Sequence, residues 1–286
     1  MPHGHLQINK VKYVKVGSLH GLSAFPAFWA IENMINNDFL LGLLRAEHIV
    51  IFTGAGISAE SGIPTFRDTQ TGLWERYDPL ALASPSGFFA DKALVWGWYE
   101  WRRMQVLRAT PNAGHFAITD LANYVERLTV ITQNVDDLHE RAGSHGVTHL
   151  HGSLHKPRCF DCGNPYTFPA SIPDEPAGGR RLEPPLCSQC NGSIRPGVVW
   201  FGESLSSMEW DRAEQAAMEC DVFFSIGTSS LVWPAAQLSE RAALHGAKII
   251  QINPIATPLD NKAHYNFRGN AGEILPAMLH SLADFF

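Results

Sequence analysis

The feature that most constrains the fold is a glycine-rich turn directly after a short apolar run. The run occupies residues 48–53, and the turn starts at Gly54 and continues to Asp68. Such a run is typical of a buried parallel strand. A strand that enters a glycine turn and then a helix forms the phosphate-binding start of dinucleotide-binding folds, where the helix N-terminus supplies N–H donors. No glycine follows Gly56 until Gly62, so the turn departs from the usual dehydrogenase fingerprint.

Apolar runs and helical spacing alternate along much of the chain. Further apolar runs predict strands at 128–132, 148–152, 221–226 and 248–253. Helical spacing predicts helices at 31–46, 88–108 and 112–124. Residues 198–202 are expected to return to the same sheet. Strands that alternate with helices predict an α/β fold, a doubly wound parallel sheet of the Rossmann type with helices on both faces.

Length and composition narrow the class of protein. The 286 residues suffice for one large domain, or for one domain with a smaller insert. A net charge of −6 leaves no broad basic surface, which disfavours nucleic acid as a partner. No apolar run reaches 18 residues, so we expect no membrane-spanning helix. Residues 1–31 contain no Asp or Glu, which suits a poorly ordered extension or, alternatively, a targeting segment.

Four of the five cysteines form two Cys-x-x-Cys pairs, Cys159 with Cys162 and Cys187 with Cys190, separated by 24 residues. Two such pairs complete a tetrahedron around one structural Zn²⁺ and leave no open position for catalysis. The alternatives are unrelated free cysteines or a redox pair. Unoxidised cysteines favour the cytoplasm, with an organelle reached through the N-terminal extension as the alternative. The fifth cysteine, Cys220, opens an apolar run and is expected to be buried.

Polar residues follow three of the predicted strands. Gln133, Asn134 and Asp136 come after the strand at 128–132, while Thr228 and Asn253 follow two others. Ligands of open α/β sheets bind at the carboxyl ends of the strands, where these side chains could hold a ribose or a carboxamide. The alternative is an ordinary polar loop in which the aspartate caps the next helix.

His151 ends the strand predicted at 148–152 and is a candidate general base. Imidazole titrates near neutral pH and suits the removal of a proton from a hydroxyl. The chain holds 13 histidines, and most histidines serve structure alone. Two neighbours, His139 and His149, carry the same chemistry.

Tyr99 and Arg102 are three residues apart on a predicted helix and therefore share a face. A phenol and a guanidinium that converge on one pocket would bind a carboxylate. Arg103 lies on nearly the same face and is the competing candidate. The alternative is a core tyrosine beside a solvated arginine.

Taken together and in this order, the motifs resemble those of the sirtuin family, the NAD-dependent protein-lysine deacylases. The motifs are Gly54-Ala55-Gly56-Ile57-Ser58, Pro64-Thr65-Phe66-Arg67, Thr132-Gln133-Asn134-Val135-Asp136, His151-Gly152, the two cysteine pairs, Val199-Trp200-Phe201-Gly202-Glu203, Gly227-Thr228-Ser229 and Asn253. The resemblance implies an NAD-binding domain at 40–152 and 197–286, a helical acyl-pocket segment at 72–111 and a zinc module at 153–196. Residues 1–39 form an extension outside it.

The resemblance also implies the reaction. NAD is a consumed co-substrate, and the acyl-lysine carbonyl oxygen attacks C1′ of the nicotinamide ribose. Nicotinamide leaves, and an alkylimidate forms. His151 is implied to be the base that then deprotonates a ribose hydroxyl, with Asn134 as a second catalytic residue. The hydroxyl attacks the imidate, and hydrolysis gives free lysine and 2′-O-acyl-ADP-ribose.

The resemblance implies two sets of binding residues. The NAD contacts are Gly54, Ala55, Gly56, Ser58, Ala59, Thr65, Phe66, Arg67, Trp74, Gln133, Asn134, Val135, Asp136, Gly227, Thr228, Ser229, Asn253, Pro254, Ile255 and Ala271. Among them, Arg67 and the turn at Gly54 serve the phosphates, and Asn134 and Asp136 serve the ribose and nicotinamide. The peptide and acyl contacts are Ala83, Tyr99, Arg102, Val199, Trp200, Phe201 and Gly202.

The pair Tyr99 and Arg102 resembles class III sirtuins, which prefer succinyl and malonyl groups, and Ala83 matches the small residue that widens their acyl pocket. Thr65 stands where many deacetylase-type sirtuins carry Asp, and this departure is compatible with class III. A buried arginine without its anionic partner is costly, so acetyl should be the poorer substrate.

Alternative functions remain open at this stage. A deacetylase-type sirtuin or an ADP-ribosyltransferase would share the NAD contacts. A dehydrogenase would need an acidic residue after the second strand, whereas Glu75 and Asp78 lie in a loop with Trp and Pro. A zinc-ribbon binding module would leave residues 198–286 unexplained. The expected partners are acyl-lysine proteins or peptides, without nucleic acid or membrane, and the expected state is a monomer.

Overall fold

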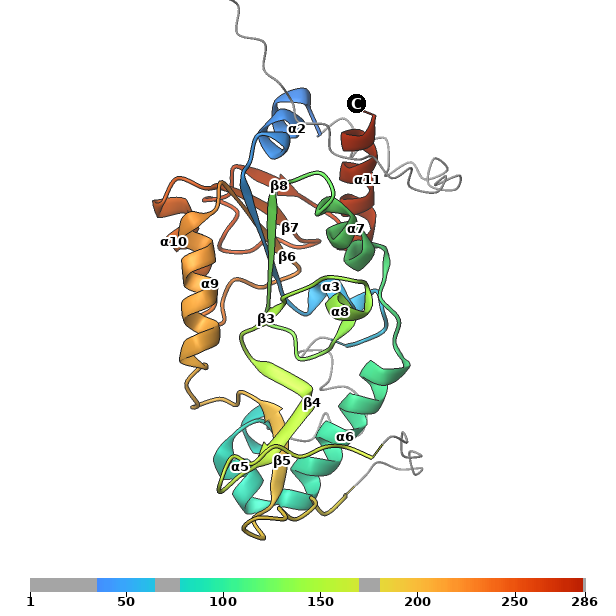
Figure 1. Cartoon of the computed structure of the whole chain (residues 1–286), viewed down its shortest axis with the longest axis vertical. Coiled ribbons are helices and arrows are strands. Elements are labelled where there is room, and N and C mark those ends of the chain that lie inside the picture. The colour runs from blue at the N-terminus through green and yellow to red at the C-terminus, as the bar shows by residue number, and fades with distance from the viewer. Residues whose placement is uncertain (1–34, 65–77, 170–180, 285–286) are drawn as a thin grey trace, which may run out of the picture.

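The structure, a computed structural model, describes residues 35–64, 78–169 and 181–284. Within these ranges six parallel strands form the main sheet, in the order β3-β2-β1-β6-β7-β8 (Figure 1). The strands are β1 (His48–Thr53), β2 (Arg127–Thr132), β3 (Thr148–His149), β6 (Val222–Ile226), β7 (Lys248–Ile252) and β8 (Tyr265–Phe267). The parallel sheet confirms the predicted doubly wound α/β class.

Helices cover both faces of this sheet, and the side chains of β1 show why. Ile49 and Ile51 are fully buried in one apolar cluster, whereas Val50 and Phe52 point into the cluster on the opposite face. The first face is covered by α2 (Asn37–Leu44), α7 (Ala113–Leu121) and α11 (Ala271–Ala283). The second face is covered by α9 (Ser207–Glu219) and α10 (Gln237–Leu244).

The order of the strands reverses between β1 and β6. From β1 the chain continues outward through β2 and β3 on one side, and it later returns to β6 on the other side of β1. Such a switch point opens a crevice at the carboxyl ends of the strands. Two short helices, α3 (Gly56–Ala59) and α8 (Leu138–Arg141), lie at this edge, between the sheet and a smaller lobe (Figure 1).

The smaller lobe combines an antiparallel pair of strands with three helices. Strands β4 (Gly152–Cys159) and β5 (Ile194–Val198) pair with each other and with no strand of the main sheet among the described residues. The helices are α4 (Pro79–Leu82), α5 (Pro85–Ala90) and α6 (Lys92–Arg108). Their shared core contains the buried aromatic rings of Phe88, Trp98 and Trp200. The division of the chain at 153 and 196 stays a prediction.

The prediction that residues 198–202 return to the main sheet is wrong. Val198 ends β5, where it pairs with Gly152 of β4. Two residues later the Trp200 ring packs on Phe88 of the smaller lobe, with 5.4 Å between ring centroids. This apolar segment is therefore buried in the second core and not under the parallel sheet.

The single helix predicted at 88–108 is divided into α5 and α6. The backbone of Asp91 is extended, with φ of −152°, and its carboxylate accepts a hydrogen bond from the Leu94 N–H at 3.0 Å. Asp91 therefore ends one helix and caps the next. Asn36 and Asn112 cap α2 and α7 in the same way, so both helices are shorter than predicted in the described residues.

The strand predicted at 148–152 ends at His149. Gly152 has a φ of +76° and turns the chain into β4, because a left-handed backbone there favours glycine. His151 consequently lies in the connection between two strands that belong to different sheets. Across the described ranges, no helix combines the length and the apolar character that a bilayer crossing demands.

Candidate active site and metal centre

The glycine turn after β1 packs directly against the turn after β6. The Gly54 N–H donates to the Ile226 carbonyl oxygen at 2.9 Å, and the Gly56 N–H donates to the Gly227 carbonyl oxygen at 2.8 Å. A Cβ on Gly56 would lie 2.7 Å from the Gly227 Cα, closer than real Cβ atoms approach. Both turns therefore need glycine so that their backbones can meet at the switch point.

Ser58, Asn134 and Asp136 form a buried polar cluster at this edge. The Asn134 amide donates to Ser58 Oγ at 3.1 Å, and the Ser58 hydroxyl donates to Asp136 Oδ2 at 3.0 Å. The second oxygen of Asp136 accepts from the Leu138 N–H at 3.1 Å. Burial raises the pKa of Asp136, while the hydrogen bonds from Leu138 and Ser58 lower it. The cluster joins α3 to the loop after β2, and the roles of these residues as NAD contacts stay predictions.

A second set of hydrogen bonds ties three strand ends together. The Gln133 amide donates to Thr228 Oγ1 at 2.8 Å, and the Asn253 amide donates to the Thr228 carbonyl oxygen at 2.7 Å. The Ile255 N–H in turn donates to Asn253 Oδ1 at 3.3 Å. The polar residues predicted from separate strands thus converge at one edge of the sheet, together with Ser229 and Pro254.

Three further predicted contacts take less polar positions. Ala59 ends α3, and Ala271 begins α11 and is buried. Val135 is partly buried against the core of the smaller lobe. Four predicted contacts, namely Thr65, Phe66, Arg67 and Trp74, lie outside the described residues. Their roles stay predictions.

His151 is placed as a neutral imidazole, with one ring nitrogen that has no hydrogen-bond partner among the described residues. Its Nδ1 lies 3.0 Å from the Gln133 carbonyl oxygen. Because a carbonyl only accepts, Nδ1 carries the hydrogen of the neutral ring and Nε2 keeps a free lone pair. Burial lowers the pKa of His151, although the bond to Gln133 acts in the opposite direction. A histidine in this state is suited to take a proton.

The structure distinguishes Arg102 from Arg103. Arg103 forms a buried ion pair with Glu100, through bonds of 2.9 and 2.8 Å, and stacks on the Phe168 ring at 3.8 Å. Arg102 lies over the Trp98 ring at 5.0 Å and pairs with no carboxylate of the described residues. Burial lowers the pKa of Arg102, against the effect of Tyr99 and Asp136 nearby. Arg103 is thus committed to the fold, whereas the role of Arg102 as a substrate contact stays a prediction.

Tyr99 stands beside Arg102 and is itself buried. Its hydroxyl accepts a hydrogen bond from Trp200 Nε1 at 2.9 Å, and burial raises the pKa of Tyr99 to about 12. The phenol therefore keeps its proton and can donate it to an anion. The bond to Trp200 also links α6 to the segment that was expected to hold the peptide.

That segment, residues 199–202, is fastened by its backbone. The Phe201 N–H donates to the Ala83 carbonyl oxygen at 2.9 Å, and the Val199 N–H donates to the His151 carbonyl oxygen at 2.8 Å. Gly202 follows with a φ of +85°. The predicted substrate residues Ala83, Tyr99, Trp200 and Phe201 are thereby brought together from α4, α6 and the end of β5.

Sequence reasoning missed the support beneath Trp200. Arg195 stacks on the Trp200 ring at 3.5 Å and pairs with Glu203 at 2.9 Å. Glu203 also accepts from the Trp200 N–H at 2.8 Å. Arg195 and Glu203 are eight residues apart, and neither belongs to a helix, so no periodicity in the sequence indicates their contact.

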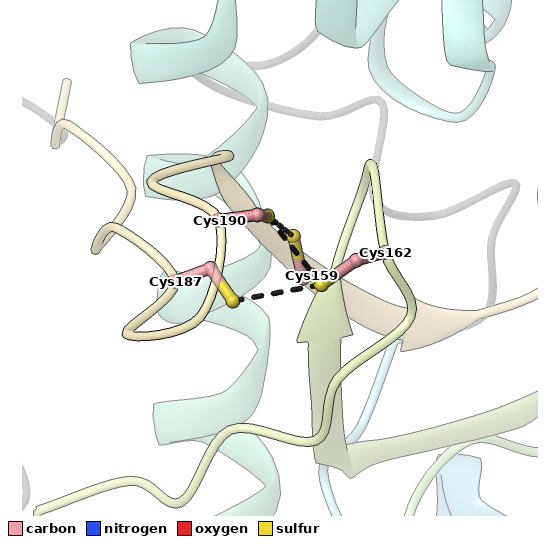
Figure 2. Close-up of side chains that lie close together, drawn as sticks. All are labelled: Cys159, Cys162, Cys187 and Cys190. Carbon is pink, nitrogen blue, oxygen red and sulfur yellow. Dashed lines mark hydrogen bonds between the residues drawn. The ribbon is translucent and has the colours of Figure 1, made fainter.

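The four paired cysteines form a metal centre in the smaller lobe (Figure 2). Their Sγ atoms all lie within 4.8 Å of one another, and three of the separations are 3.5, 3.7 and 3.4 Å. Tetrahedral zinc with Zn–S bonds of 2.3 Å separates its sulfurs by about 3.8 Å. Backbone N–H groups of Gln189 and Cys190 lower the pKa of Cys187 to about 6. Geometry and thiolate chemistry both fit the predicted structural zinc.

The metal centre also belongs to the core of the smaller lobe. Cys159 and Cys187 are buried with Trp96 of α6 and Ile194 of β5. Figure 2 shows Cys159 and Cys162 at the end of β4, facing Cys187 and Cys190 on the loop that leads to β5. The cluster thus fastens both strands to the helix that carries Tyr99 and Arg102. Cys220 lies apart and is buried, as predicted.

A doubly wound sheet with polar strand ends at its switch point, joined to a four-cysteine zinc lobe, defines a class of NAD-binding α/β proteins. A profile of the Sir2 family matches residues 54–234. An NAD-dependent protein deacylase of Methylococcus capsulatus is 62% identical over 247 residues, which cover 86% of this chain and 97% of that protein. The chain belongs to the Sir2 family, and the resemblance inferred from the sequence is confirmed.

Two further proteins support this membership. NAD-dependent protein deacylase 1 of Pseudomonas aeruginosa is 54% identical over 239 residues, covering 83% of this chain and 95% of that protein. The solved complex of a Sir2 homologue with NAD superposes with a TM-score of 0.80 at 43% identity, covering 88% of this chain and 95% of the homologue.

Proposed function

We propose that the chain removes acidic acyl groups, succinyl and malonyl, from lysine side chains in an NAD-dependent reaction, and acetyl more weakly. NAD-dependent protein deacylation follows from membership of the Sir2 family and from relatives that are NAD-dependent protein deacylases. The acyl preference is carried by one observation, the guanidinium of Arg102 beside Tyr99 without a carboxylate partner among the described residues.

The polar strand ends are proposed to hold NAD. Asn134 and Asp136 are fixed by Ser58 and Leu138 and are offered to the ribose and nicotinamide. The turns at Gly54 and Gly227 are offered to the rest of the dinucleotide, near the N-terminus of α3. NAD supplies the electrophilic C1′ of its nicotinamide ribose, with nicotinamide as the leaving group.

His151 is proposed to be the general base. Its Nδ1–H bond to Gln133 fixes the ring and leaves Nε2 free to accept a proton from a ribose hydroxyl. The hydroxyl can then attack the acyl carbon, which is still bonded to the lysine nitrogen, and water releases the lysine amine and leaves the acyl group as an ester on the ADP-ribose. Burial lowers the pKa of His151 and so keeps the ring neutral at neutral pH.

The acyl pocket is proposed to lie between α4, α6 and residues 199–202. Ala83 is buried and small, so its side chain takes up less of the proposed pocket than a larger residue would. At its end the Arg102 guanidinium and the Tyr99 hydroxyl can both donate to a carboxylate. An acetyl group leaves both donors without that partner, which makes it the poorer substrate.

The experiment compares one peptide that carries acetyl-lysine, succinyl-lysine or malonyl-lysine, with products followed by mass spectrometry. Arg102→Met is expected to lower kcat/KM for the acidic acyl groups by on the order of 10²-fold and to leave deacetylation nearly unchanged. Arg212→Met on α9, an exposed arginine outside the site, is the matched control and should behave like wild type.

The outcomes separate the alternatives. A preference for acetyl that Arg102→Met does not alter would indicate a deacetylase-type sirtuin. Loss of nicotinamide without any removal of an acyl group would indicate an ADP-ribosyltransferase on the same scaffold. Nicotinamide release that depends on the acylated peptide supports the deacylase.

We further propose that the enzyme acts as a monomer on proteins or peptides, in a reducing compartment such as the cytoplasm. Four cysteines close enough to bind zinc support a reducing compartment, since thiolates that hold a metal must stay unoxidised. Size-exclusion chromatography with light scattering tests the oligomeric state.

A further inference from the structure

Two histidines hold neighbouring carbonyl groups of the segment that contains Asn134. His151 Nδ1 lies 3.0 Å from the Gln133 carbonyl oxygen, and His149 Nδ1 lies 3.0 Å from the Asn134 carbonyl oxygen. The second nitrogen of His149 differs from that of His151, because it lies 2.7 Å from Glu140 Oε1. His149 therefore has a partner on both sides of its ring.

Both partners of His149 are oxygens that accept. A carbonyl has no hydrogen to donate, and neither has an ionised carboxylate. A neutral imidazole carries one N–H and can satisfy only one of these acceptors. The imidazolium carries two and satisfies both, so the geometry requires His149 to be charged while His151 is neutral.

The electrostatic surroundings agree with this geometry. Burial lowers the pKa of His149, but the hydrogen bond and charge of Glu140, with the Asn134 carbonyl and Asp136, outweigh it and raise the pKa overall. The side chain of His149 is 14% exposed and that of Glu140 is 42% exposed, so the imidazole is largely shielded from water while the carboxylate is partly open to it. Burial raises the pKa of Glu140, but the hydrogen bond to His149 lowers it, and the pKa of Glu140 is lowered overall.

Other charged groups surround this pair. On α8, His139 lies near enough for the two imidazoles to influence each other, and Asp137 precedes that helix and faces Glu140. On α9, which also packs near β3, Arg212 lines a cavity with Thr148. Successive strand residues point to opposite faces, so Arg212 is on the other side from the His149 ring.

The bond from His149 completes the fixation of Asn134. The Asn134 N–H donates to Thr132 Oγ1 at 3.0 Å, and the side-chain amide donates to Ser58 Oγ at 3.1 Å. The backbone carbonyl oxygen of Asn134 accepts the bond from His149. The charge of His149 also lowers the pKa of Asp136, although burial is the larger influence and raises it. One imidazolium therefore supports both residues offered to the nicotinamide ribose.

We propose that His149, charged through its pairing with Glu140, is a positioning residue for Asn134 and gives NAD binding an alkaline limit. The inference rests on the proposed role of Asn134 in holding the nicotinamide ribose. His149 is charged below its raised pKa, so its two bonds are complete at lower pH and one is lost as the pH rises.

The first test observes His149 directly, without reference to catalysis. Long-range ¹H–¹⁵N NMR of the histidine rings is recorded from pH 5 to 10 for wild type and Glu140→Gln. We expect both ring nitrogens of His149 to be protonated at pH 7 in wild type, and the midpoint to move to lower pH in the variant. A neutral His149 at pH 7, or a midpoint that Glu140→Gln leaves in place, overturns the proposal.

The second test measures the Kd for NAD by calorimetry across the same pH range. Glu140→Gln is expected to move the alkaline loss of binding to lower pH. His149→Asn places a non-titrating amide N–H where Nδ1 donates, so it should remove that loss. His145→Asn, at an exposed neighbouring histidine, is the control. An alkaline limb shared by all variants overturns the proposal, whereas absence of acyl-dependent NAD consumption would contradict the proposed function alone.

Discussion

The two lobes are held together by different means. The larger lobe buries an unbroken apolar layer on each face of its sheet, and Phe223 and Phe224 illustrate this because they lie in opposite clusters and are both fully buried. Among the described residues the smaller lobe has a two-stranded sheet, and its core includes two cysteines of the metal centre. A sheet of two strands is marginal in water. The proposed NAD contacts therefore rest on apolar packing, whereas the proposed acyl pocket depends on the metal centre.

Removal of zinc should show the difference in stability between the two lobes most clearly. Structural zinc sites contribute about 10–16 kcal/mol of binding free energy, so Cys187→Ser is expected to lose the metal and the order of the smaller lobe. Hydrogen exchange should then show loss of protection in β4 and β5, with β1 and β6 still protected. Cys220→Ser, in the larger lobe, should keep the zinc. Equal loss in both lobes would show that they unfold as one unit.

Phe224→Ala tests the apolar packing of the larger lobe instead. The ring is fully buried, and its removal should lower the free energy of unfolding by about 3–5 kcal/mol. Urea unfolding measures this loss, and atomic absorption should find the zinc content of the folded protein unchanged. Phe89→Ala is the matched control, because that ring is 68% exposed and should cost less than about 0.5 kcal/mol. Similar losses in the two variants would contradict the assignment of the cores.

Gly56→Ala tests the contact between the two turns. The added Cβ would lie 2.7 Å from the Gly227 Cα, so the turns must move apart at a cost of about 1–3 kcal/mol. NAD binding should weaken as well, and calorimetry measures both changes. Gly42→Ala on α2 is the control, since its nearest contact is a flexible lysine tip at 3.7 Å. Unchanged NAD affinity in Gly56→Ala would show that the contact between the two turns does not influence NAD binding.

Acid should weaken the larger lobe through His115. Burial lowers the pKa of His115 to about 4, below the value of about 6.5 in the unfolded chain. The unfolded chain then binds the extra proton first, so stability is lost as the pH falls from 6.5 toward 4. Between pH 7.5 and 5.5 this loss is about 1 kcal/mol. His115→Gln keeps an acceptor for the helix cap and should remove it in urea titrations. An unaltered pH dependence would exclude His115 as its source.

The main sheet could be predicted because its strands are continuous apolar runs. The antiparallel pair could not, since Pro157 interrupts β4 and Pro196 with Gly197 interrupts β5, and such residues weaken a strand pattern. Strand β8 has only three residues, too few for a period. The polar strand ends were predictable as a group, because carboxyl ends of parallel strands share one edge of the sheet.

The partners within the site were less predictable. Spacing alone places Arg102 and Arg103 on nearly one face, and only the bond to Glu100 shows which of them is committed to the fold. Likewise, His149 and His151 have the same chemistry in the sequence. Their opposite charge states depend on Glu140, which comes from a different element, α8.

The hydrogen bond between the Ala83 carbonyl and the Phe201 N–H joins two backbones, not two side chains. This link in the frame of the proposed acyl pocket does not depend on which side chains line it, whereas the bond from Trp200 to Tyr99 does. Exchange of the side chains at 83 and 102 can therefore redirect the enzyme to a different acyl group and leave both links in place. A library limited to these two positions should retain folding while it explores selectivity.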